Sequence, residues 1–254
     1  MLRLGRISYA NMAPVFYELD GEGLEQVSGV PTTLNRMLMA GEIDVAPISS
    51  IEYARNADKL RLLPRLCVST EGAVDSIQLI TRKPIEQVRT VAVTPESATS
   101  VVLTKVLLGD VALVPLDQPA DARMLIGDAA LRSAFEDPTP HYDLGRLWQE
   151  RTGLPMVYAV WACRKEIDEG LRELERAHLR SLAVARSEPE ALARQAAVEY
   201  GWPAGFLARY FEKLRYRFGP RERAGLMTFL ELAHDAGELD EVPELRFVRE
   251  AVPA

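Results

Sequence analysis

The sequence has few of the residues that most often carry metal or nucleophilic chemistry. It holds two cysteines and three histidines among 254 residues. Cys67 and Cys163 both lie in apolar runs and neither belongs to a CxxC pair, so a cysteine-ligated zinc site is not expected. We expect two buried, reduced thiols, although the count alone leaves a disulfide open. The histidines, His141, His178 and His234, form no HExxH motif and no Ser-His-Asp spacing, which leaves metal-dependent and triad mechanisms without support.

The sequence also lacks an excess of basic residues. It has 30 Lys and Arg against 37 Asp and Glu, for a net charge of −7. Broad binding to nucleic acid needs a basic face that releases counterions, so we expect no nucleic-acid partner. A small anionic ligand stays compatible with this charge, because a local pocket of dipoles can hold it.

Long hydrophobic runs are missing as well. No apolar stretch is long enough to span a bilayer, and the first residues show no apolar core or small-residue cleavage site of a secretory signal. We therefore expect a cytoplasmic protein that does not contact a membrane.

The first two-thirds of the chain alternates strand and helix patterns. Strands are predicted at Leu2–Ser8, Ile43–Ile48, Leu62–Val68, Ser76–Thr81, Val91–Thr94, Val111–Leu116, Arg123–Ile126 and Met156–Arg164. Helices are predicted at Ala13–Leu19, Thr32–Ala40, Ser50–Asn56, Ala98–Leu108 and Tyr142–Thr152. This alternation is typical of an α/β protein with a parallel or mixed sheet.

The last third of the chain is helical. Its patterns predict helices at Ile167–Arg186, Pro189–Tyr200, Ala204–Lys213 and Arg221–Ala236. Two strand-like segments, Ser76–Pro84 and Leu154–Arg164, suit crossings between lobes. We therefore predict a discontinuous first lobe, 1–84 and 161–254, with a second lobe, 85–160, inserted into it. A small-ligand cleft is expected between the lobes.

The stretch from Gly29 to Ser50 is the most informative. A proline-started helix ends at Gly41, a buried strand follows, and Ser49 and Ser50 stand where that strand meets the next helix. Ligands of open α/β sheets bind at the carboxyl ends of strands, and a helix start offers N–H groups to an anion. We predict that Ser49 and Ser50 bind an anionic substrate.

Two further strand–helix junctions carry polar groups. Tyr9 and Asn11 follow the first strand, where Asn11 either caps the next helix or points into the cleft. Thr94, Ser97, Thr99 and Ser100 surround the start of the helix at 98–108. There Ser97 is a natural N-cap, and the alternative is a carboxylate bound on the amides of residues 99 and 100.

Weaker candidates follow two other strands. Ser69, Gly72 and Ser76 come after the strand at 62–68, where a plain turn is the alternative to a substrate-binding loop. Asp128 follows the strand at 123–126. We interpret it first as a helix cap and second as a carboxylate facing the cleft.

Taken in order, these loops resemble those of the chorismate dehydratase family of the futalosine route to menaquinone. No single motif is specific, but the ordered set is, and it extends to about Arg164. The matching segments are Gly5-Arg-Ile-Ser-Tyr-Ala-Asn11 with Pro14, Leu34-Asn35 with Gly41-Glu-Ile-Asp44, Ile48-Ser-Ser-Ile-Glu-Tyr53, Leu63-Pro64, Gly72 with Val74 and Ser76, Val91-Ala-Val-Thr94 with Ser97-Ala-Thr-Ser100, Gly127-Asp-Ala-Ala-Leu131, Tyr142-Asp-Leu-Gly145 with Trp148, and Thr152-Gly-Leu-Pro155 with Trp161.

The resemblance implies a two-lobed fold like that of periplasmic binding proteins of type II. It also implies a hydro-lyase that converts chorismate, a dicarboxylate, into 3-[(1-carboxyvinyl)oxy]benzoate and water, without metal or organic cofactor. Because no histidine or cysteine base is evident, we hypothesise that the enolpyruvyl carboxylate of the substrate takes the proton. Asn11 would then orient the substrate or bind the departing hydroxyl, which makes it the predicted catalytic residue.

Two alternatives stay open. The first is the sister enzyme, 1,4-dihydroxy-6-naphthoate synthase, whose Ser-Pro-Cys-Pro-Asn-Asp start is replaced here by Ser-Tyr-Ala-Asn. The second is a non-catalytic protein that binds a small anion, since fold does not determine function.

Overall fold

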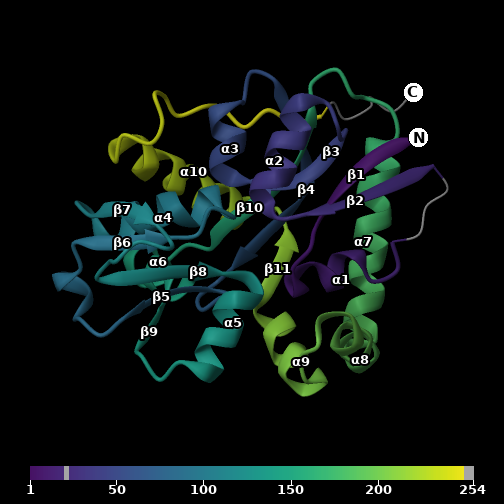
Figure 1. The fold of residues 1–254 in the computed structure, drawn as a ribbon. Coiled ribbons are helices and arrows are strands. Elements are labelled where there is room, and N and C mark those ends of the chain that lie inside the picture. Colours follow the sequence, from purple (N-terminus) through teal and green to yellow (C-terminus); the bar gives the residue numbers. More distant parts are fainter. Residues whose placement is uncertain (20–22, 249–254) are drawn as a thin grey trace.

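The computed structural model describes residues 1–19 and 23–248 and contains two β-sheets (Figure 1). The six-stranded sheet has the order β11-β4-β10-β3-β1-β2, and the five-stranded sheet has the order β7-β6-β8-β5-β9. The first is built from β1 (Leu2–Ile7), β2 (Leu24–Gly29), β3 (Val45–Ser49), β4 (Leu60–Thr70), β10 (Met156–Arg164) and β11 (Leu214–Arg217). The second is built from β5 (Ile77–Thr81), β6 (Thr90–Val93), β7 (Ala112–Pro115), β8 (Ala122–Ile126) and β9 (His141–Asp143).

Both sheets are mixed. In the six-stranded sheet, β1 runs parallel to β2 and β3, whereas β10 is antiparallel to β3 and β4. In the five-stranded sheet, β6 is parallel to β7 and β8, and β5 is antiparallel to β8 and β9. The predicted α/β class with a mixed sheet is therefore confirmed.

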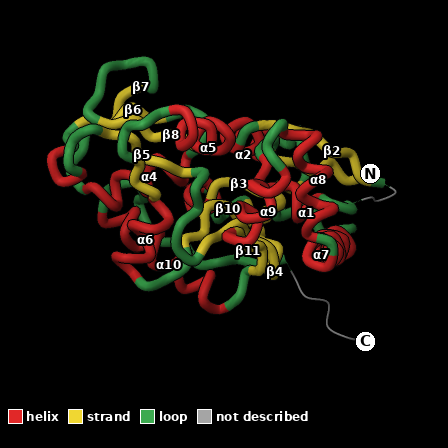
Figure 2. The backbone as a smooth tube through the Cα atoms, turned by 90° about the horizontal axis from the view of Figure 1, so that it is seen from below, coloured by secondary structure: helices red, strands yellow, loops and turns green. Residues whose placement is uncertain are grey.

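Helices cover both sheets. The first sheet carries the 3-10 turn η1 (Ala10–Met12), α1 (Ala13–Phe16), α2 (Pro31–Ala40), α3 (Ser50–Arg55), α7 (Leu171–Ser187), α8 (Pro189–Tyr200), α9 (Ala204–Lys213) and α10 (Pro220–Asp235). The second carries the 3-10 turn η2 (Ile85–Gln87), α4 (Ala98–Leu108), α5 (Gly127–Glu136) and α6 (Leu144–Thr152). Figure 2 shows α7 and α8 on the far side of the six-stranded sheet from the five-stranded sheet.

Local sequence signals explain several helix ends. Pro31 occupies the first turn of α2, and Gly41 ends that helix in the left-handed conformation with φ 74°. Ser97 caps α4 by accepting a hydrogen bond from the Ser100 amide. Asp143 caps α6 in the same way through the amide of Arg146.

Four elements were not predicted as such. The strands β2 and β11 and the helix α5 fall where the sequence analysis placed no strand or helix range, and β9 overlaps the start of the helix predicted at Tyr142–Thr152. In β2 no residue is buried, and in β11 only Leu214 and Tyr216 are. No apolar alternation marks β2, and β11 alternates over only four residues, so sequence periodicity does not reveal them.

The residues of the two sheets do not coincide with the residues assigned to the two predicted lobes. Strand β5, assigned to the first lobe, pairs with β8 and β9 in the five-stranded sheet. Residues 156–160 of β10, assigned to the second lobe, pair in the six-stranded sheet. Nearly all residues of both strands are buried, so burial does not distinguish them and only their pairing partners do. The lobe boundaries 1–84, 85–160 and 161–254 themselves stay a prediction.

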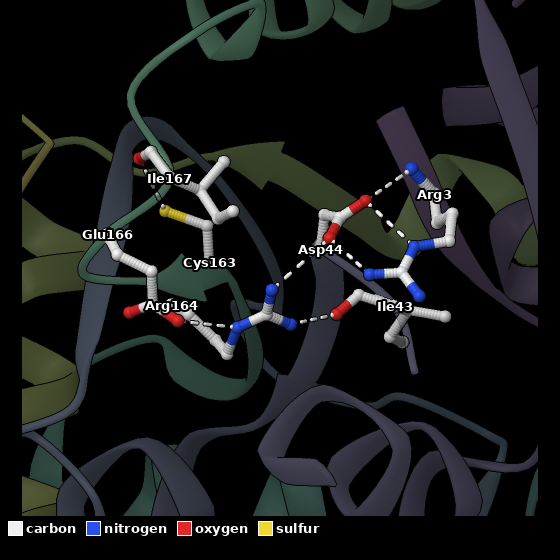
Figure 3. Close-up of polar contacts among 7 residues, drawn as sticks. All are labelled: Arg3, Ile43, Asp44, Cys163, Arg164, Glu166 and Ile167. Carbon is white, nitrogen blue, oxygen red and sulfur yellow. Dashed lines mark hydrogen bonds and ion pairs between the residues drawn. The ribbon is translucent and has the colours of Figure 1, made fainter. Parts of the chain in front are cut away.

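A charged network holds β1, β3 and β10 together (Figure 3). The buried Asp44 accepts hydrogen bonds from Arg3 Nε and Nη2 at 3.1 and 2.7 Å, and Arg164 Nη2 approaches the same carboxylate at 3.3 Å. Arg164 Nη1 also donates to the Ile43 carbonyl at 2.7 Å. These contacts, above all the hydrogen bonds from Arg3, lower the pKa of Asp44 to about 2.

A buried histidine joins α7 to the first sheet. His178 Nε2 accepts from the Trp161 indole at 3.2 Å, so the hydrogen sits on Nδ1 and is donated to the Val15 carbonyl at 3.1 Å. Burial lowers the pKa of His178 to about 4, which keeps the ring neutral near pH 7. His178 lies within a charged helical segment of the sequence, a pattern that predicts a surface position, and this prediction is wrong. The predicted thiols are confirmed, since Cys67 and Cys163 are buried and unbridged.

Candidate functional site

A cleft lies between the two sheets, at the carboxyl ends of β1 and β3. It contains about 570 Å³ of space not filled by atoms, its open mouth included. Its lining is Ile7, Tyr9, Asn11, Pro31, Ser49, Val68, Val74, Ser76, Ile77, Ser97, Ser100, Ile126, Gly127, Tyr158, Ala159 and Leu214.

Asn11 reaches the cleft from η1. Neither η1 nor α1 starts with a side-chain cap, so the interpretation of Asn11 as a helix cap is wrong. Its Oδ1 atom is buried and has no hydrogen-bond partner among the described residues. Its backbone carbonyl accepts a hydrogen bond from the Tyr216 hydroxyl, which anchors η1 to β11. A buried amide oxygen without a partner is costly, so this atom is a candidate contact for a ligand.

Tyr9 crosses the cleft. Its hydroxyl donates to Glu96 Oε2 at 2.7 Å, and its ring lies against Gly127. Glu96 and Gly127 both belong to the side of the five-stranded sheet, whereas Tyr9 follows β1. Burial, and then the hydrogen bond to Glu96, raise the pKa of Tyr9, so the phenol stays neutral.

Ser97 and Ser100 stand at the start of α4. The Ser100 amide donates to Ser97 Oγ at 3.1 Å, and the two hydroxyls lie 2.9 Å apart. The predicted N-cap is thus confirmed. Because both residues also line the cleft, the start of an 11-residue helix faces any ligand there.

The two serines predicted together at residues 49 and 50 separate in space. Ser49 lines the cleft and is held by the buried Asn35, whereas the Ser50 hydroxyl donates to the Val157 carbonyl at 2.8 Å. The amide of Ile51, in the first turn of α3, donates to Thr99 Oγ1 at 3.4 Å. Thr99 therefore bridges to α3 instead of lining the cleft.

Four more predicted residues lie outside the lining. Ser69 is in β4, not in a loop, and its hydroxyl donates to the Arg215 carbonyl at 3.4 Å. Gly72 lies in a bend at φ 106°, and Thr94 Oγ1 accepts from the Glu96 amide at 3.3 Å. Asp128 lies in the first turn of α5 without capping it, which corrects the predicted cap. Burial raises the pKa of Asp128.

Ser76 lines the cleft, as expected, and its carbonyl accepts from the Gly127 amide at 2.8 Å. Tyr158 was missed, because its position in the middle of the apolar run of β10 indicated only a core residue. Its hydroxyl lies 2.9 Å from Thr70 Oγ1, at the wall of the cleft.

The described lining contains no Asp, Glu, Lys, Arg or His. Within residues 1–19 and 23–248, no group of three or more His, Cys, Asp and Glu side chains is arranged to hold a metal ion. In the same residues no helix is both long and apolar enough to cross a membrane. The polar groups offered to a ligand are therefore hydroxyls, one amide side chain and backbone N–H groups.

Comparisons with known proteins agree with this architecture. The chain is 36% identical over 260 residues to the chorismate dehydratase of Thermus thermophilus, covering 90% of this chain and 93% of that protein. It is 27% identical over 208 residues to the 1,4-dihydroxy-6-naphtoate synthase of the same organism, covering 74% and 76%.

Solved structures identify the fold. A protein of Archaeoglobus fulgidus matches with a TM-score of 0.79 at 23% identity, over 93% of this chain and 97% of that one. The periplasmic aliphatic sulphonate binding protein of Escherichia coli matches with a TM-score of 0.65 at 12% identity, over 100% and 95%. The predicted periplasmic-binding-protein-like fold is thus confirmed. Residues 2–235 match the family model described as menaquinone biosynthesis, and the chain belongs to that family.

Proposed function

We propose that this protein is a chorismate dehydratase, a hydro-lyase that converts chorismate into 3-[(1-carboxyvinyl)oxy]benzoate and water. The observation that carries the proposal is the unpartnered amide oxygen of Asn11 in a hydroxyl-lined cleft. It is supported by the 36% identity, over 90% of the chain, to a protein of that name.

The cleft suits a dicarboxylate in spite of its lack of charged side chains. The start of α4, with Ser97 and Ser100, offers a positive dipole end and hydroxyl donors. Ser49 and Ser76 add hydroxyls from the other parts of the lining. We assign the two carboxylates of chorismate to these groups. The other predicted contacts stay predictions, because the residues concerned do not line the cleft: Ser50, Ser69, Gly72, Thr94, Thr99 and Asp128.

The proposed reaction removes one ring proton and the neighbouring hydroxyl, and the ring becomes aromatic. No histidine, cysteine or carboxylate belongs to the described lining, so the enolpyruvyl carboxylate of the substrate takes the ring proton. The amide of Asn11 accepts a hydrogen bond from the departing hydroxyl and holds it in position. The electron pair of the broken C–H bond forms the new ring double bond as the C–O bond breaks. The protonated carboxyl group gives its proton to the departing oxygen, which leaves as water, and neither a cofactor nor a metal takes part. A cytoplasmic location, and the absence of nucleic-acid and membrane partners, stay predictions.

The test is direct. Purified protein treated with a chelator is mixed with chorismate, and the products are followed by chromatography and mass spectrometry beside a heat-unfolded sample. Loss of one water with a new aromatic absorption supports the proposal. Chorismate that binds and stays intact would indicate a binding protein, and chorismate that does not bind would direct the next assay to the substrate of the naphthoate synthase.

A further inference from the structure

Glu96 connects the two sides of the cleft by two contacts. It lies in the turn between β6 and α4, and its Oε2 atom accepts the hydrogen bond of the Tyr9 hydroxyl at 2.7 Å. Its backbone carbonyl accepts from the Thr32 amide, in the first turn of α2, at 3.3 Å. Tyr9 and Thr32 both belong to segments of the six-stranded sheet. One residue of the five-stranded side therefore holds two segments of the other side at the cleft.

The ring of Tyr9 has little freedom in this arrangement. A Cβ atom at position 127 would lie 2.9 to 3.0 Å from three atoms of the ring, so the ring rests directly on the Gly127 backbone. Gly127 also has a φ of 56°, a conformation that favours glycine. The glycine therefore makes room for the ring, and the hydrogen bond to Glu96 orients it.

Glu96 contacts the hydroxyl of Tyr9 without lining the cleft itself. Tyr9 and Gly127 line the cleft, and Glu96 does not. Its carboxylate therefore does not belong to the wall that meets an anionic ligand. Tyr9 presents a neutral ring there, because its hydroxyl hydrogen is used by Glu96.

We infer that Glu96 is a positioning residue for the proposed dehydration: it holds the ring of Tyr9 against Gly127, and this ring forms the wall that orients the ring of the substrate. The inference rests on the proposed function. The expected effect is on the orientation of the substrate during the reaction and not on its affinity, because the groups that we assign to its carboxylates are other residues. Loss of the hydrogen bond should therefore lower kcat and change KM little.

Four variants test the inference by steady-state kinetics with chorismate. Glu96→Ala is expected to lower kcat about tenfold or more while KM changes less than about threefold. Glu96→Gln keeps an oxygen that accepts from Tyr9 and should retain most of kcat. Tyr9→Phe keeps the ring and removes the hydroxyl, so it should match Glu96→Ala and also serves if that variant does not fold. The double variant Tyr9→Phe/Glu96→Ala should be no slower than the slower single variant, because both remove one bond.

The chain offers a matched control pair. Tyr17 donates to Glu188 at 3.5 Å on the exposed surface, and neither residue lines the cleft. Tyr17→Phe and Glu188→Ala should leave kcat and KM unchanged. Native kcat in Glu96→Ala and Tyr9→Phe, or losses that multiply in the double variant, would overturn the positioning role alone. A native protein that does not convert chorismate would instead overturn the proposed function, and this inference with it.

Discussion

Asn35 binds Ser49 through both atoms of its amide group. Its Nδ2 donates to Ser49 Oγ at 3.2 Å, and its Oδ1 accepts from the Ser49 amide at 3.1 Å. Both residues are buried, so a helix side chain fixes the last residue of a central strand where it faces the cleft. A hydroxyl that lines the cleft is thus positioned by a residue that does not itself line it.

This pairing predicts the effect of Asn35→Ala. The substitution leaves the buried Ser49 amide without its partner, which should cost about 1–3 kcal/mol in the free energy of unfolding. Urea unfolding measures this. Asn56→Ala is the control, since Asn56 donates a single bond to the Glu52 carbonyl at a half-buried position. Equal small losses in both variants would contradict the prediction.

Asn11→Ala tests the proposed catalytic residue. Removal of the amide should lower kcat about 100-fold or more, because the departing hydroxyl loses its orienting contact. The Kd for chorismate should change much less, since the proposal assigns the carboxylates to other groups. Kinetics and calorimetry measure the two effects, again with Asn56→Ala as control. A variant with native kcat would refute the role.

Gly127→Ala tests whether the position of the Tyr9 ring affects catalysis, and a glycine control accounts for the backbone strain that a positive φ imposes on alanine. The new Cβ atom would displace the Tyr9 ring, so kcat should fall together with a modest loss of stability. Gly201→Ala is the matched control, because Gly201 also has a positive φ, 73°, in the left-handed region, and its Cβ would meet nothing within 4 Å. That variant should lose a similar stability of about 1 kcal/mol and keep native kcat. Equal activities of the two variants would argue against a role for the ring position.

The charged network of Figure 3 predicts a difference between buried and surface pairs. Asp44→Ala leaves Arg3 and Arg164 without their shared carboxylate and should lower the free energy of unfolding on the order of 2 kcal/mol. Glu42→Ala removes only the exposed pair with Arg36 and should cost less than about 0.5 kcal/mol. Because the pKa of Asp44 is lowered to about 2, its contribution is complete above its ordinary value and is lost as the pH falls toward 2. Urea titrations of both variants at pH 7 check the difference.

From the buried His178 we expect a second pH dependence of the free energy of unfolding, separate from that of Asp44. The pKa of His178 is lowered to about 4, so the unfolded chain binds a proton more readily than the folded chain. The free energy of unfolding should therefore fall as the pH drops from above 6.5 to 4, by up to about 3 kcal/mol. His178→Gln should flatten this part of the curve, and the exposed His234→Gln should not. The same slope in native protein and His178→Gln would contradict the assignment.

Elements with strong local signals were predictable from the sequence. The bounds of α4, α8, α9 and β10 are those expected, because a serine cap, a proline at a helix start or a fully apolar run marks each of them. Edge strands such as β2 and β11 were not predictable, since their neighbours in the sheet and not their own apolar patterns stabilise them.

The sequence by itself determined the α/β class and the loops that carry the polar groups. Of the 12 predicted site residues, the tertiary structure brings Tyr9, Asn11, Ser49, Ser76, Ser97 and Ser100 into one cleft. It turns the hydroxyls of Ser50 and Ser69 toward backbone carbonyls and directs the hydroxyl oxygen of Thr99, in α4, to the Ile51 amide of α3. Neighbouring residues of a strand point to opposite faces, and a hydroxyl bonds the nearest buried partner. Which serine faces a ligand is therefore decided by strand register and by the packing of the two sheets.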